Sequence, residues 1–177
     1  GYYNHAAVIG TDGTERFVIP AKKWYLYYAN DGFSSGLANI EIYKTDPEKI
    51  KQWSSDDSKT YIGTIDSNGK IIHSDQNWKG ITPFHNGRAF VKEKEGWFLI
   101  NQKGEKINQK PYLNVLYGSF NVKSEQLFED GMQFVNTEEG LGAVDINGQM
   151  IVQPMEIPDS YEKLHRKGNV IVFSALC

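Results

Sequence analysis

The sequence predicts an all-β fold built from about four tandem antiparallel β-hairpin repeats. Three observations support this: two short patterns alternate along the chain, glycine follows Asn or Asp at turn positions, and the intervening segments are short and rich in Val, Ile, Phe, Tyr and Trp. With 10 Tyr, 9 Phe and 17 Gly, the composition also favours pleated strands joined by tight turns.

The first pattern is an apolar residue, three turn-type residues and a glycine, followed by further apolar residues. It occurs at residues 9–13, 65–69, 100–104 and 144–148. Its glycines, Gly13, Gly69, Gly104 and Gly148, are predicted turn residues and lie 56, 35 and 44 residues apart. The pattern therefore recurs with a period of roughly 35–44 residues, with one longer interval.

The second pattern is Phe-x-x-Gly followed by an apolar strand. It occurs at residues 33–40, 84–91 and 128–135, and a looser copy with one extra residue spans 164–172. Its predicted turn glycines are Gly36, Gly87, Gly131 and Gly168. Residues 89–92 and 133–136 show the alternation expected of strands.

These patterns divide a single domain, 1–177, into repeats at 1–40, 61–96, 97–140 and 141–177. The step from Ile40 to Ile65 is 25 residues, whereas the equivalent steps in the next two copies are 9, so an insertion is expected at about 41–60. Within it, Asp46 and Pro47 resemble the start of a short helix over 46–53.

Each repeat is expected to form three to four strands joined by short turns. A lone hairpin cannot bury its apolar face, so the repeats must pack on one another. Stacking into a solenoid-like row and closure into a small propeller or barrel both satisfy this requirement, and the sequence leaves both open.

The paired patterns resemble the WG-containing repeat family, also called KWG repeats, of bacterial proteins. The segment 95–104 carries the family's Trp at Trp97, and the segments 62–69 and 141–148 carry its Gly at Gly63 and Gly142. No copy has both residues, because Phe98 follows Trp97 and Ile62 and Leu141 precede the glycines. The resemblance implies a β-repeat architecture and a bacterial source, and it supplies no catalytic residues.

Composition excludes several classes of function. The net charge of −3 gives no basic field for nucleic acid, and the lone Cys177 permits neither an internal disulfide nor a multi-thiolate metal site. No apolar run is long enough to span a bilayer. Because Gly1 opens directly onto Tyr-rich sequence, we expect the chain to be a segment of a longer protein.

No catalytic or metal site and no cofactor is predicted. The four histidines lack ligand spacing, and the motifs at Asp66 and Asp145 resemble calcium-loop fragments but are better explained as hairpin turns. Carboxylate pairs at 56–57, at Glu93 and Glu95, and at 138–139 suggest glycan hydrolysis only if they face one another across a cleft.

Aromatic residues are the best candidates for a binding site. The predicted set is Trp24, Tyr25, Tyr27 and Tyr28, joined by Trp53 in the insertion and Trp78 in the second copy. In a strand, Trp24 and Tyr28 would share one face, and Tyr25 and Tyr27 the other. We expect one pair to be exposed, because both faces of a small repeat domain are not easily core; packing between repeats is the competing interpretation.

The sequence therefore predicts a non-catalytic bacterial interaction module. It would present aromatic and loop residues to a protein or glycan, without nucleic acid or membrane insertion, and outside the cytoplasm. A structural or accessory segment of a larger protein is the alternative, and a glycan hydrolase is a third hypothesis.

Overall fold

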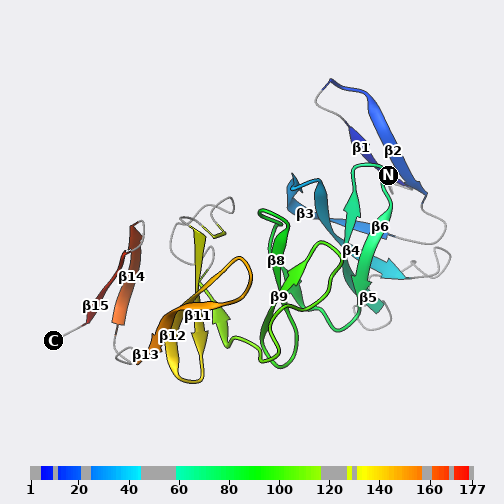
Figure 1. Ribbon diagram of the computed structural model, residues 1–177. Coiled ribbons are helices and arrows are strands. Elements are labelled where there is room, and N and C mark those ends of the chain that lie inside the picture. The colour runs from blue at the N-terminus through cyan, green and yellow to red at the C-terminus, as the bar shows by residue number, and fades with distance from the viewer. Residues whose placement is uncertain are drawn as a thin grey trace.

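The computed structural model describes residues 5–9, 12–20, 25–44, 59–116, 127–128, 131–156, 161–167 and 170–175. Within these ranges every regular element is a β-strand, and every strand pairing is antiparallel (Figure 1). The predicted all-β, antiparallel fold class is confirmed.

The strands form five sheets, each a meander in which neighbours in sequence are neighbours in space. The first hairpin is β1 (His5–Ile9) with β2 (Glu15–Pro20), and the last is β14 (Tyr161–Lys167) with β15 (Val170–Ala175). One four-stranded sheet contains β3 (Tyr25–Ser34), β4 (Leu37–Lys44), β5 (Lys59–Asp66) and β6 (Ile71–Asp75). A second contains β10 (Asn114–Val115), β11 (Met132–Thr137), β12 (Gly140–Asp145) and β13 (Met150–Met155).

Between them lies the sheet of β7 (Gly80–Ile81), β8 (Arg88–Lys92) and β9 (Trp97–Asn101). Two isolated bridges, Ile100 to Lys106 and Trp97 to Tyr112, lay the segment 106–112 along the free edge of β9. This segment therefore occupies the fourth-strand position that β6 and β13 hold in their own sheets.

The sheets are out of phase with the predicted repeats. Residues 40 and 41 both lie in β4, and residues 140 and 141 both lie in β12. The boundary between 96 and 97 separates β8 from β9, although these two strands pair with each other. The sheet units run instead over about 25–75, 80–112 and 114–155. The turn patterns show where the chain reverses, but not which strands share a sheet.

Part of the predicted insertion at 41–60 lengthens the β4–β5 hairpin. Residues 41–44 continue β4 and residues 59–60 begin β5, and these ends pair with each other. Residues 45–58, including the predicted helix over 46–53, lie outside the described residues.

The sheets follow one another in a row and pack face to face (Figure 1). One core joins the β3–β6 sheet to the β7–β9 sheet and contains Leu37, Ile62, Trp78, Phe84, Ala89, Val91, Phe98 and Ile100. The next core joins the β7–β9 sheet to the β10–β13 sheet and contains Phe90, Leu99, Tyr112, Val115, Leu127, Phe128, Val135 and Val144. In the part of the chain described, no sheet closes into a barrel, and the first and last hairpins lie at opposite ends of the row.

The middle sheet is therefore apolar on both faces. In β8, Ala89 and Val91 face the preceding sheet while Phe90 faces the next, and all three are fully buried. This corrects the expectation that both faces of a sheet are not easily core here. A sheet that lies between two others is shielded from water on both faces, so the sequences of its strands are continuous apolar runs.

Three first-pattern turns share one set of hydrogen bonds. Oδ1 of Asp145 accepts the backbone N–H of Asn147 and of Gln149, each at 2.8 Å, and Gly148 N donates to Asp145 O at 2.9 Å. The turns that start at Asp66 and Asn101 repeat these contacts within 0.1–0.2 Å. The calcium-like motifs are thus turns whose side-chain oxygen binds the chain's own amides.

The predicted turn glycines adopt a common backbone conformation. Those described have φ between 75° and 80°: Gly13, Gly36, Gly69, Gly87, Gly104, Gly131 and Gly148. Gly168 lies outside the described residues. At the Phe-x-x-Gly turns, Ser35 and Asn86 also have positive φ, as the primed two-residue hairpin turn requires.

Candidate functional site

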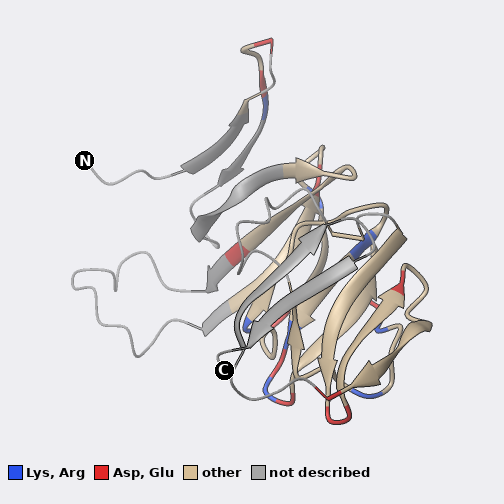
Figure 2. Cartoon of the chain, turned by 90° about the vertical axis from the view of Figure 1, so that its left-hand side faces the viewer, with Lys and Arg blue, Asp and Glu red and all other residues tan. Residues whose placement is uncertain are grey.

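The packing restricts where a partner can meet the molecule. The faces of the inner sheets are covered by neighbouring sheets, so strand edges and turns provide the accessible surface. Figure 2 shows the charged residues among those described concentrated at the turns, while the strands are mostly uncharged. A binding site on this part of the chain must therefore use an edge or a row of turns.

Most of the predicted aromatic site cannot be placed. Trp24 and Trp53 lie outside the described residues, as do the side chains of the three tyrosines. The backbone of Tyr25, Tyr27 and Tyr28 lies in β3, an edge strand, opposite Tyr43, Glu41 and Ile40 of β4. A binding role for these tyrosines stays a prediction.

Trp78 does not belong to an exposed surface. Its side chain is 3% exposed and lies in the core between the β3–β6 and β7–β9 sheets, with its ring centroid 4.7 Å from that of His73. Trp78 sits between two strands rather than within one, so strand alternation gave no indication of where it points. The competing interpretation, packing between repeats, holds for this residue.

A different surface emerges along the fourth strands. We define the fourth-strand edge as β6, the segment 106–112 and β13, each at the same edge of its sheet. The turns link these segments, because Gly104 lies against the His73 ring of β6 and Gly148 lies against the Ile107 side chain. The edge therefore runs continuously across three sheets.

Aliphatic side chains are exposed along this edge. Ile71 in β6 is 39% exposed, and Ile151 and Met155 in β13 are 48% and 52% exposed. In β13 these two residues and Gln153 are exposed, while the residues between them are partly buried. Sequence reasoning missed this surface, because the residues it named as binding candidates were all aromatic.

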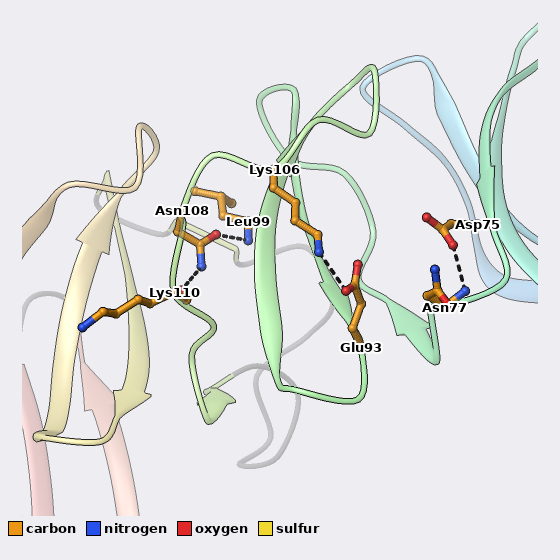
Figure 3. A network of polar contacts seen from close by, with 7 residues as sticks. All are labelled: Asp75, Asn77, Glu93, Leu99, Lys106, Asn108 and Lys110. Carbon is orange, nitrogen blue, oxygen red and sulfur yellow. Dashed lines mark hydrogen bonds and ion pairs between the residues drawn. The ribbon is translucent and has the colours of Figure 1, made fainter.

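Polar contacts occupy the centre of the edge (Figure 3). Lys106 Nζ lies 2.7 Å from Glu93 Oε2 and 3.8 Å from the centroid of the Phe98 ring. Asn108 accepts the N–H of Leu99 at 2.7 Å and donates to Lys110 O at 2.6 Å. Side-chain bonds from Asn108 thus hold the segment against β9 where regular strand pairing is interrupted.

Among the described residues, two groups have shifted pKa values. Burial, and secondarily the charge of Asp145, raise the pKa of the Tyr112 hydroxyl above its usual value. Hydrogen bonds from Thr14, first its hydroxyl and then its N–H, lower the pKa of Asp12. Tyr112 is thus kept neutral in the core, as a structural aromatic residue requires.

The metal-ligating and acidic side chains of the described residues can be followed one by one. Within this part of the chain, no three His, Cys, Asp or Glu side chains are placed to hold one metal ion. Of the predicted carboxylate pairs, Glu93 is ion-paired with Lys106, and residues 56–57 lie outside the described ranges. His73 stacks on Trp78, and the backbone of His85 closes a hairpin with Arg88.

The described chain also forms no helix of the length and apolarity needed to cross a membrane. A scan of known protein families and searches of curated proteins and of solved structures found no match to this chain. The resemblance to WG repeats accordingly stays a prediction from the residues quoted above.

Proposed function

We propose that this chain is a non-catalytic interaction module made of WG-type β-repeats stacked in a solenoid-like row, and that it binds a protein partner along the fourth-strand edge. The proposal keeps the bacterial, extracytoplasmic setting that the sequence suggested. Its main support is the exposure of aliphatic residues at the fourth-strand edge of both four-stranded sheets.

Equivalent contacts between successive sheets support the repeat stack. In two first-pattern turns, the second residue contacts the Phe-x-x-Gly hairpin of the preceding sheet. Gln102 Nε2 donates to Ser35 O at 3.1 Å, and Ile146 O accepts from Arg88 Nε at 2.9 Å. Gln102 and Ile146 occupy the same turn position. A contact that recurs with the repeat is expected when each unit packs on the next in the same way.

A protein fits the fourth-strand edge better than a glycan does. Ile71, Ile151 and Met155 are aliphatic side chains, which suit a protein surface, whereas sugars bind flat aromatic rings. Edge strands such as β6 and β13 also offer backbone groups to an added strand. The tyrosines of β3 keep the glycan alternative open at the opposite edge.

The test is a binding experiment with matched surface variants. The full chain is titrated by calorimetry and Trp fluorescence against purified candidate proteins and a panel of soluble cell-wall glycans. Ile151→Asp is expected to weaken binding of the protein partner at least tenfold. Leu113→Asp, which changes a residue 56% exposed directly before β10, the first strand of its sheet, is the control and should bind normally.

Each other outcome has a definite meaning. Saturable glycan binding that survives Ile151→Asp would overturn the assignment of partner and edge. Equal loss in both variants would point to general destabilisation, which circular dichroism would reveal. No binding to any probe would favour the alternative, an accessory or spacer segment.

A further inference from the structure

One polar pair interrupts the apolar contact between the first two large sheets. Asn39 and Thr64 are directly opposite each other on β4 and β5, and they are 8% and 1% exposed. The residue pairs in the same position of the next two sheets are Phe90 with Leu99 and Phe134 with Ala143. Both of those pairs are apolar and buried.

Only part of this polar pair is satisfied by protein. Asn39 Nδ2 crosses the junction and donates to Thr82 O at 2.9 Å. Asn39 Oδ1 and Thr64 Oγ1 are buried and have no hydrogen-bond partner in the structure. Two unpaired polar atoms on adjacent, registered residues are a costly arrangement, and such groups usually share a bound water molecule.

The polar pair lies in mostly apolar surroundings. The same junction contains the buried side chains of Leu37, Ile62 and Trp78, which keep bulk solvent away. The next residue across the strands is His73, whose ring is held between Trp78 and the backbone of Gly104. A neutral acceptor and a hydroxyl suit a small neutral hydrogen-bonding molecule.

We propose that the junction between the β3–β6 and β7–β9 sheets binds one ordered water molecule between Asn39 Oδ1 and Thr64 Oγ1. The water donates one hydrogen bond to the amide oxygen of Asn39 and forms a second hydrogen bond with the Thr64 hydroxyl. This site is independent of the proposed function, because it requires only the packing of these two sheets.

The direct test is a crystal structure of the full chain at about 1.5 Å, which resolves ordered water. The expected result is a density peak within hydrogen-bonding distance, about 2.7–3.2 Å, of both oxygen atoms. An empty junction, or a Thr64 hydroxyl bonded directly to Asn39 Oδ1, would overturn the proposal.

A second test uses the sign of a stability change. If water is bound, Thr64→Val removes the hydroxyl that is one hydrogen-bond partner of the water. The substitution should then lower Tm by about 2–4 °C, the shift expected for one net hydrogen bond in a chain of this size. Without water, the same change removes an unpaired hydroxyl and should raise Tm. Thr64→Ser keeps the hydroxyl and is the control, with a smaller decrease than Thr64→Val expected if water is bound.

Discussion

At the scale of single residues, one side-chain oxygen organises each of three first-pattern turns. Asp66, Asn101 and Asp145 use Oδ1 in the same way, accepting the N–H groups of the second and fourth residues that follow. An aspartate and an asparagine serve equally, because the bond needs an acceptor oxygen at that position and not a charge. The turn therefore tolerates this exchange but not loss of the oxygen.

Asp145→Ala is expected to lower the free energy of unfolding by about 1–2 kcal/mol, since two backbone N–H groups lose their acceptor. Asp145→Asn copies the turn at Asn101 and should stay within about 0.5 kcal/mol of the parent. Urea unfolding of both variants, followed by circular dichroism, checks the difference. Equal losses would show that the charge, rather than the hydrogen bonds, matters.

Glycines in this chain are required for two different reasons. Gly36 has φ +77° with nothing within 4 Å of an added Cβ, so only backbone strain opposes a side chain there. Gly140 has φ +121°, and an added Cβ would lie 2.2 Å from the backbone oxygen of Met155. That oxygen belongs to β13, which pairs with β12 at this point.

Gly36→Ala should therefore cost about 1–2 kcal/mol, the price of a left-handed conformation. Gly140→Ala should cost about 3 kcal/mol or more, because β13 must also move away from β12. Thermal unfolding of the two variants gives the comparison. A Gly140→Ala protein as stable as Gly36→Ala would mean that β13 does not approach β12 as closely as described.

At the scale of strands, burial on both faces explains the sequences of the middle sheet. Leu99 and Ile100 are adjacent in β9, point to opposite sides and are both fully buried in different cores. A strand with one wet face would have placed a polar residue at one of these positions.

Leu99→Ala and Ile100→Ala should each cost about 2–5 kcal/mol, the range for truncating a buried aliphatic residue. Lys103→Ala, in the exposed turn that follows, is the control and should change stability by less than about 0.5 kcal/mol. Chemical unfolding of all three measures this. A small effect at either core position would show that the corresponding face of β9 is not packed.

Local chemistry made the turns predictable, whereas the long-range packing was not. The turn at Asn68-Gly69 was predictable from the sequence, because it depends only on the local backbone conformation that these residues prefer. The apolar run Trp97–Asn101 does not indicate whether one or both faces of its strand are buried, because Phe, Leu and Ile are common in both situations. The exposure of Ile151 and the burial of Trp78 likewise depend on neighbouring sheets, which no short pattern records.

At the scale of the whole molecule, successive junctions differ in chemistry. The junction at Asn39 and Thr64 contains a buried polar pair, whereas the next junction has Phe90 and Leu99 in the same position. Asn39 also requires one particular acceptor, Thr82 O, on the adjoining sheet. This polar pair helps to specify the order in which the sheets pack. A neighbouring sheet without an acceptor at this point would leave the side-chain amide of Asn39 without its hydrogen bond.

Because each sheet contacts only its neighbours, damage at one junction should spread unequally. Leu99→Ala opens a cavity toward the β10–β13 sheet, and Ile100→Ala opens one toward the β3–β6 sheet. In a stack with nearest-neighbour coupling, each cavity loosens the adjoining sheet most. Leu99→Ala should therefore speed amide exchange in β11 and β12 more than in β4 and β5, and Ile100→Ala should do the reverse. Hydrogen-exchange mass spectrometry of the two variants resolves these strands. Identical exchange profiles in both variants would mean that the row of sheets unfolds as one cooperative unit, in which the position of a defect has no influence on where the chain opens.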